Sequence, residues 1–170
     1  MNGIGRYIAL PYWPAVAGSF YPADPGRLQA AVQSYLDAAT ARTPPPKAVI
    51  APHAGYIYSG PIAGSAYASI PDTVERVVLL GPAHRVAFHG LGVPSVDAFR
   101  TPLGDVPLDR DTISDLLAHP DISQRDDAHA LEHSLEVHLP FLQVALSRFT
   151  LVPIVVGNAT HAQVADVLDR

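Results

Sequence analysis

The sequence contains no cysteine, which excludes disulfide bonds, thiolate catalysis and thiolate ligation of a metal within this chain. Positive charge is also scarce, because 11 Lys and Arg stand against 16 Asp and Glu and are scattered along the chain. No apolar run approaches the roughly 18 to 20 residues that a helix needs to cross a membrane. We therefore expect neither a nucleic-acid partner nor a membrane partner.

Several motifs of common enzymes are missing as well. Gly55 and Gly60 follow an apolar segment, as in a phosphate-binding loop, but the dinucleotide fingerprint and the GK[ST] ending are absent. Ser59 and Ser134 carry hydroxyl groups, yet no G-x-S-x-G nucleophile elbow surrounds either of them. Nucleotide binding and serine hydrolysis are therefore not favoured.

The N-terminal stretch Tyr7–Ala17 is apolar and ends in a small-residue pattern like that of a signal-cleavage site. Pro11 and Pro14 interrupt it, however, and only Arg6 precedes it, which is unlike a secretory signal. We expect a cytoplasmic protein. At 170 residues and 48% apolar composition, the chain is expected to form one α/β domain over residues 1–170.

Two short apolar segments, Lys47–Ala51 and Arg76–Leu80, are typical of buried strands. Between them, Pro61–Ile70 is small, Ala-rich and long enough for a crossover helix. Such a strand-helix-strand unit makes the two strands parallel in one sheet with a right-handed connection. The sequence therefore predicts a largely parallel central sheet flanked by helices.

The remaining elements follow from capping and periodicity. Asp24 before Pro25 marks a helix start, and Leu28 and Val32 begin its buried face. Pro140 inside Leu131–Phe149 predicts either a kinked helix or a regular helix that starts only at the proline. The other expected elements are a strand and loop at Gly90–Phe99, a turn at Leu103–Val106, a helix at Asp109–His119, a strand at Leu151–Gly157 and a helix at Thr160–Arg170.

His53 and His84 are the most informative residues, because each lies just past one of the two predicted parallel strands. The carboxyl ends of parallel strands meet at one edge of a sheet, where open α/β proteins bind their ligands. A single histidine at a strand end is commonly a loop or capping residue, but two at adjacent strand ends favour a shared site. We therefore predict that His53 and His84 lie together.

The segment Glu132–His138 adds two imidazoles and two carboxylates. On a regular helix His133 and His138 are about 140° apart and do not face one ion, so one residue, His138 or Glu136, is expected to join His53 and His84. Two imidazoles with a carboxylate suit non-haem Fe(II), whereas three nitrogens with water suit zinc. Either set leaves one residue of the segment free as an acid or base.

Each of the other candidates has a structural interpretation. Glu132 and Glu136 suit a solvated helix face, and Tyr56 and Tyr58 suit either a pocket wall or the core. The remaining histidines considered are expected to be ordinary surface or loop residues; they are His89, His119, His129 and His161.

These segments together resemble the Memo family, called AmmeMemoRadiSam system protein B in prokaryotes. The matching stretches are Ala17–Pro22, Ile50–Gly60, Leu80–His84, Phe99–Gly104 and Glu132–Phe141. They occur in family order and span nearly the whole chain. The resemblance implies an α/β fold similar to that of class III extradiol dioxygenases, which open catechols with non-haem Fe(II) and dioxygen.

By resemblance, His53 and His84 are metal ligands, and His138 is a pocket histidine that serves as the catalytic proton carrier. Tyr56 and Glu136 are then expected to bind the substrate. The implied cofactor is a divalent transition metal, Fe(II) first, with zinc or copper as alternatives. A Ser-Ser-Asp segment, a further histidine and the third metal-ligand position of the family have no counterpart before Arg170. The chain therefore resembles the N-terminal portion of the family fold, without its C-terminal part.

The resemblance leaves several functions open. The first is a metal-dependent oxidoreductase acting on a small molecule. The second is a binding module without catalysis, since the family is also described as recognising phosphotyrosine peptides and partly protonated histidines hold anions. The third is a component of a modification system with a radical S-adenosylmethionine protein as partner. Self-association into a homo-oligomer is a further expectation, because a sheet without its later strands exposes an apolar edge.

Overall fold

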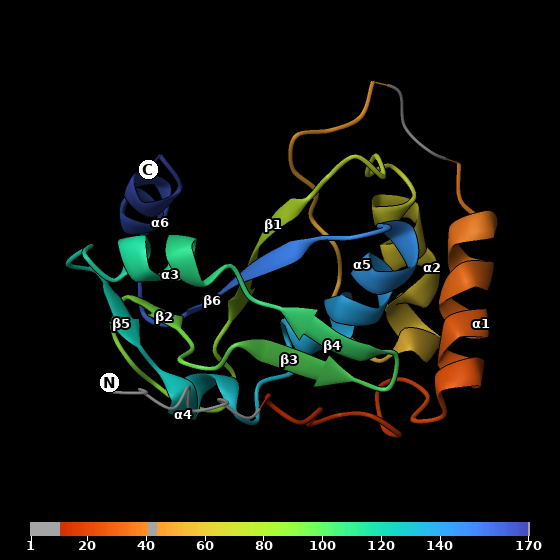
Figure 1. Ribbon diagram of the computed structural model, residues 1–170, viewed down its shortest axis with the longest axis horizontal. Helices are drawn as coiled ribbons and strands as arrows, with labels where there is room; N and C mark the ends of the chain where they lie inside the picture. The colour runs from red at the N-terminus through yellow and green to blue at the C-terminus, as the bar shows by residue number, and fades with distance from the viewer. Residues whose placement is uncertain (1–10, 41–43, 170) are drawn as a thin grey trace, which may run out of the picture.

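The computed structural model describes residues 11–40 and 44–169, and it is a mixed α/β fold as predicted (Figure 1). Residues 7–10 of the signal-like stretch lie outside the described residues. The helices are α1 (Pro25–Asp37), α2 (Tyr56–Tyr67), α3 (Arg110–Leu116), α4 (Asp126–His129), the 3₁₀ turn η1 (Glu136–His138), α5 (Leu139–Ala145) and α6 (His161–Leu168). The strands are β1 (Arg76–Pro82), β2 (Leu91–Val93), β3 (Ala98–Thr101), β4 (Gly104–Pro107), β5 (Ile122–Gln124) and β6 (Thr150–Val156).

The central sheet has the strand order β1-β6-β2-β5, and β3 and β4 form a separate hairpin. β1 pairs with β6 in parallel and β2 pairs with β5 in parallel, whereas the junction between β2 and β6 is antiparallel. The sheet is therefore mostly parallel, as the sequence predicted. Because β1 and β6 run in register from Arg76 opposite Thr150 to Pro82 opposite Val156, their carboxyl ends lie side by side.

The strand predicted at Lys47–Ala51 is wrong. Within the described ranges this segment belongs to no strand, and the side chain of Ile50 is 99% exposed. The parallel neighbour of β1 is β6, which lies far away in the sequence. An apolar run is compatible with a strand, which is why the sequence predicted one here. A strand also needs a neighbouring backbone to complete its hydrogen bonds, and side-chain character alone does not reveal whether that neighbour is present.

Helices cover both faces of the sheet. In Figure 1, α1, α2 and α5 form one group beside β1 and β6, and α3 and α6 lie on the other side. The main core is built from buried side chains of both groups, with Leu28 and Val32 from α1, Phe141 from α5 and Leu151 from β6 among its members.

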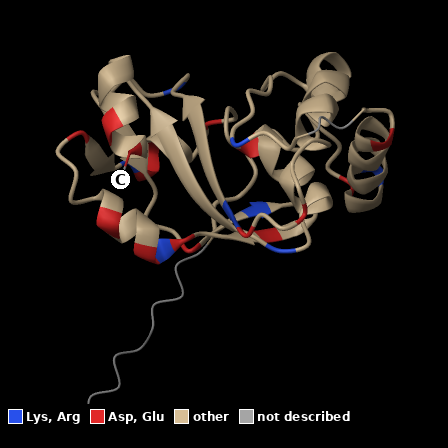
Figure 2. Ribbon diagram, turned by 90° about the horizontal axis from the view of Figure 1, so that it is seen from above, with Lys and Arg blue, Asp and Glu red and all other residues tan. Residues whose placement is uncertain are grey.

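Within the described residues, no helix has the length and apolar character required to span a membrane. In Figure 2, the Lys and Arg residues, drawn in blue, are found on several different helices, strands and loops.

Helix α1 begins where the sequence places its start. The Asp24 side chain accepts a hydrogen bond from the Arg27 amide at 2.8 Å, and Pro25 occupies the first helical position. Replacing Asp24 with alanine is expected to lower the free energy of unfolding by about 1 kcal/mol, because the amide loses its capping acceptor. Urea denaturation measures this effect, and an unchanged midpoint would show that the cap does not stabilise the domain.

The segment before Pro140 is not a regular helix. Residues 131–135 are irregular, a 3₁₀ turn spans Glu136–His138, and α5 begins at Leu139 with Pro140 in its first turn. Proline is tolerated there because the first amides of a helix have no acceptor within it. Of the two outcomes predicted for this proline, the structure confirms the later helix start.

Candidate metal centre

Three histidines from separate parts of the chain meet beside the carboxyl end of β1. His53 lies in the loop before α2, His84 follows β1, and His133 lies in the irregular segment between α4 and η1. One ring nitrogen of each can be chosen so that all three lie within 4.8 Å of one another. The ring centroids are 4.6 Å apart for His84 and His133, 5.2 Å for His53 and His84, and 5.9 Å for His53 and His133.

The close packing of the segment containing His133 against β1 depends on Gly81. A Cβ atom at this position would lie 2.7 Å from Ser134 Oγ and 2.8 Å from Leu135 Cδ2, so both side chains would have to shift. The Ser134 hydroxyl also donates to the Pro82 carbonyl at 2.8 Å. These contacts bring His133 to the strand end that carries His84.

The environment of His53 and His133 favours their neutral form. Burial lowers the pKa of His53, and the neighbouring His84 lowers it further. Burial also lowers the pKa of His133, although Glu132 opposes this effect. A neutral imidazole is the form that ligates a metal, because its ring nitrogen keeps a free lone pair.

Glu132 is buried at this centre, which corrects the prediction of a solvated helix face. Its Oε1 lies 2.8 Å from His84 Nδ1, and its Oε2 accepts from the His84 amide at 2.6 Å. Burial alone would raise its pKa, but the hydrogen bonds from His84 and from the Ser134 amide outweigh burial and hold the pKa at about 2. The carboxylate is therefore ionised at neutral pH. Local sequence patterns do not predict these contacts, because they depend on how the irregular loop folds.

Glu136 is also buried, again contrary to the predicted solvated face. Its carboxylate accepts from the Ala15 amide at 2.6 Å, the Val16 amide at 3.1 Å and the Tyr21 hydroxyl at 2.5 Å. Burial raises its pKa, against the effect of these hydrogen bonds. Glu136 thus attaches the N-terminal segment to η1. Its predicted role in substrate binding stays a prediction.

Tyr56 and Tyr58 have different surroundings. Tyr56 is buried in the core, and its hydroxyl donates to the Val137 carbonyl at 2.7 Å. Tyr58 is exposed and lines the cavity beside His53. A direct substrate contact by Tyr56 stays a prediction.

His138 is not the residue that joins His53 and His84; the expectation of His138 or Glu136 was wrong, and His133 takes that place. The expected angle of about 140° between His133 and His138 holds only on a regular helix, whereas His133 lies in an irregular segment. His138 is buried, with its ring centroid 5.9 Å from that of Tyr67. Burial, and to a lesser extent His53, lower its pKa to about 4. Its predicted role as a proton carrier stays a prediction.

Two further histidines are buried rather than ordinary surface residues. His129 Nε2 lies 3.0 Å from the Gly92 carbonyl oxygen. His119 Nε2 lies 2.9 Å from Asp166 Oδ2, and its Nδ1 accepts from the Asp121 amide at 3.1 Å. The first of these contacts joins α4 to β2, and the second joins α6 to the loop before β5. Both histidines therefore stabilise the fold.

A cavity of about 1040 Å³ opens beside His53 and His133. Its wall is mostly apolar and, within the part of the chain that the structure describes, includes no Lys or Arg. Its members are Ser19, Phe20, Ile50, Ala51, Pro52, Ala54, Gly55, Ile57, Tyr58, Ile62, Leu80 and Pro82, with the two histidines. A cavity with apolar walls and a few convergent polar groups is typical of a small-molecule site.

Comparison with protein families identifies the chain. The model of the Memo-like protein family matches residues 13–169. The chain belongs to the Memo family. Its histidines at positions 53, 84 and 133 therefore lie within the family-matched region.

Relatives from bacteria, archaea and animals share this region. A MEMO1 family protein of Aquifex aeolicus is 44% identical over 84% of this chain and 54% of its own length. A MEMO1 family protein of Archaeoglobus fulgidus is 43% identical over 92% of this chain and 58% of its own length. Protein memo-1 homolog of Caenorhabditis elegans is 37% identical over 93% of this chain and 45% of its own length. The chain spans about half the length of these Memo relatives.

The donor atoms of the three-histidine centre fit a transition metal. Imidazole nitrogens suit iron, zinc and copper, and this centre offers three of them. His133 Nδ1 is buried without a hydrogen-bond partner among the described residues, although Glu132 Oε1 lies 3.3 Å away. Buried polar atoms in native proteins normally have a partner, so an orphaned ring nitrogen in a histidine cluster favours a ligand there.

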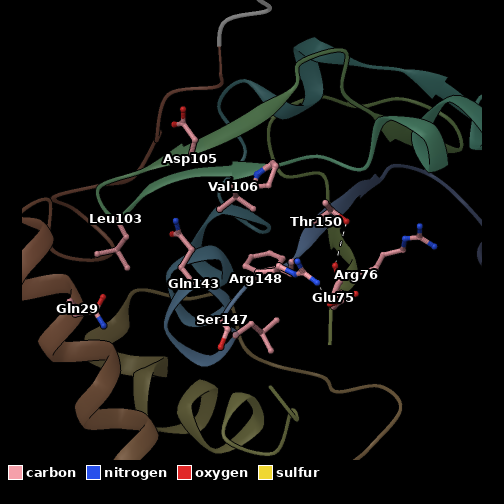
Figure 3. A pocket seen from close by; sticks show the side chains of 13 residues that line it. Gln29, Glu75, Arg76, Leu103, Asp105, Val106, Gln143, Ser147, Arg148 and Thr150 are labelled. Carbon is pink, nitrogen blue, oxygen red and sulfur yellow. Dashed lines mark hydrogen bonds and ion pairs between the residues drawn. The ribbon is translucent and has the colours of Figure 1, made fainter. Parts of the chain in front are cut away.

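A second cavity, of about 850 Å³, lies at the amino ends of β1 and β6, away from the histidines (Figure 3). Arg148 there forms an ion pair with Glu75, and Arg76 forms one with Asp109. The Gln143 amide donates to the Gly104 carbonyl at 3.2 Å. Because these polar groups already have partners within the protein, we assign no ligand to this cavity.

Proposed function

We propose that this chain is a metal-binding Memo-family protein in which His53, His84 and His133 hold one divalent transition metal. The observation that carries the proposal is the approach of three ring nitrogens within 4.8 Å of one another at one end of the sheet. Lowered pKa values of His53 and His133 support it, because metal binding then displaces few protons.

We propose Fe(II) as the metal and an oxidoreductase reaction on a small organic substrate. When bound, Fe(II) would supply redox chemistry toward dioxygen and Lewis acidity toward the substrate. Three protein ligands leave coordination positions open, which is the arrangement of catalytic rather than structural metal sites. Zinc and copper suit the same nitrogens and are the competing ions.

The residues around the centre have distinct proposed tasks. The wall that includes Phe20, Ile57 and Leu80 would hold the apolar part of a substrate and exclude water from it. His138, neutral because its pKa is about 4, has a buried Nδ1 without a hydrogen-bond partner among the described residues. His138 remains the proposed proton carrier, although a pKa of about 4 makes its neutral ring a weak base at neutral pH.

Binding of a phosphotyrosine peptide is the weaker alternative. Among the described residues, the cavity wall contains no Lys or Arg to pair with a phosphate. Burial lowers the pKa of both His53 and His133, so these imidazoles carry little positive charge at neutral pH. The metal-site proposal agrees better with both observations.

The proposal is tested by anaerobic loading with Fe(II) and metal analysis after desalting. The wild-type protein is expected to retain about one metal per chain, and His53→Ala and His84→Ala are expected to retain little. His129, a buried histidine outside the centre, provides the matched control, because folded His129→Ala should retain metal as the wild type does. Equal metal retention in wild type, His53→Ala and His84→Ala would rule out the proposed centre.

A further inference from the structure

We infer that Glu132 is a positioning residue that fixes the ring tautomer of His84 and holds His84 and His133 in one arrangement. The inference rests on the proposed function, because it concerns the ligand geometry of the same centre. Glu132 was not among the site residues that the sequence predicted.

Four donors converge on the Glu132 carboxylate. Main-chain amides supply three of them, from His84 to Oε2 at 2.6 Å and from His133 and Ser134 to Oε1 at 2.8 and 2.9 Å. The fourth contact is His84 Nδ1 at 2.8 Å from Oε1. Main-chain amides only donate, so both carboxylate oxygens act as acceptors.

These contacts determine which ring nitrogen of His84 carries the proton. Because Oε1 accepts, His84 Nδ1 must donate, and a neutral His84 then keeps its lone pair on Nε2. Metal-ligating histidines commonly donate their other ring N–H to a carboxylate, which sets the tautomer and the ring orientation. Glu132 therefore prepares His84 Nε2 as the ligand atom.

The same carboxylate joins two loops that are far apart in sequence. It binds the main chain of His84, which follows β1, and the main chain of His133, which precedes η1. Glu132 itself is buried, so water does not compete for these hydrogen bonds. The ring separation of 4.6 Å between His84 and His133 is thereby held before any ligand arrives.

The first test uses the wild-type protein without metal. Nitrogen-15 NMR of the histidine rings is expected to show His84 protonated at Nδ1 and unprotonated at Nε2. A His84 ring protonated at Nε2 would overturn the inference. This measurement requires neither a variant nor a bound metal, so it decides the role of Glu132 even if the proposed metal site fails.

The second test compares Glu132→Gln with Asp126→Asn. The Glu132 variant keeps the shape of the side chain but replaces one acceptor oxygen with an NH2 group. With that group at the Oε2 position the contact from the His84 amide is lost, and with it at the Oε1 position three contacts are lost, including that of His84 Nδ1. The neutral amide oxygen is also a weaker acceptor for the Nδ1 proton than the carboxylate. We expect a larger share of the Nε2-protonated tautomer of His84 and Fe(II) affinity about 10- to 100-fold weaker. Asp126 also accepts from a main-chain amide, that of Ser95, and from the Tyr12 hydroxyl, but it does not contact the three histidines. Its variant should keep wild-type affinity and the wild-type tautomer of His84.

The outcomes separate the two proposals. An unaltered tautomer and unaltered affinity in folded Glu132→Gln would overturn the positioning role while leaving the metal site intact. Absence of metal binding in the wild type, together with the expected tautomer change in Glu132→Gln, would overturn the metal site but not the effect of Glu132 on His84. Circular dichroism confirms folding, and if the variant does not fold, the wild-type tautomer decides.

Discussion

Replacing His133 with alanine is expected to weaken Fe(II) binding on the order of 100-fold or more, because it would remove one of the three proposed ligands rather than a supporting residue. His138→Ala is expected to leave the affinity near that of the wild type. The structure places a ring nitrogen of His133, and none of His138, in the group of three within 4.8 Å. Isothermal titration calorimetry with Fe(II) under anaerobic conditions measures both affinities.

Both histidine variants need a check of folding, because His138 is buried against Tyr67. Circular dichroism and a urea transition like that of the wild type would show that the affinity changes are local. Loss of the metal in His138→Ala together with its retention in His133→Ala would contradict the proposed centre. That result would make His138 the third ligand, as expected from the sequence.

Gly64→Ala is expected to lower the free energy of unfolding by about 2 kcal/mol, although alanine is the better helix former. Gly64 lies in α2 where this helix approaches α1. A Cβ atom there would lie 2.5 Å from the main-chain oxygen of Tyr35 and 2.8 Å from its carbonyl carbon. Backbone atoms cannot rotate away as a side chain does, so the two helices must separate.

Gly26→Ala provides the matched control for this helix contact. Gly26 lies on the exposed surface of α1, and a Cβ atom there would meet only the Asp24 carboxylate at an ordinary 3.4 Å. This variant is expected to be as stable as the wild type or up to about 1 kcal/mol more stable. Urea denaturation of both variants gives the comparison, and equal midpoints would contradict the close approach of α1 and α2.

Much of the fold could be predicted from the sequence because local signals determine where its elements begin. The Asp24–Pro25 pair places the start of α1, and the apolar run at Leu151 predicts β6. The failure at Lys47–Ala51 has a different cause. An apolar run is compatible with a strand, but pairing depends on a neighbour that local sequence does not specify.

The candidate site was predicted in part. His84 lies at the carboxyl end of β1, as strand-end reasoning requires. His53 lies beside it although no strand precedes it, so that prediction was correct in position and wrong in its reason. His133 and Glu132 were missed because both lie in an irregular segment, where helical spacing does not describe which side chains face one another.

X-ray absorption spectroscopy of the Fe(II)-loaded wild-type protein decides whether three imidazoles bind one metal. We expect one iron per chain whose scattering fits three histidine ligands, and a fit with two in His133→Ala. Iron that is absent after desalting, or bound in the wild type without histidine scattering, would rule out the three-histidine centre.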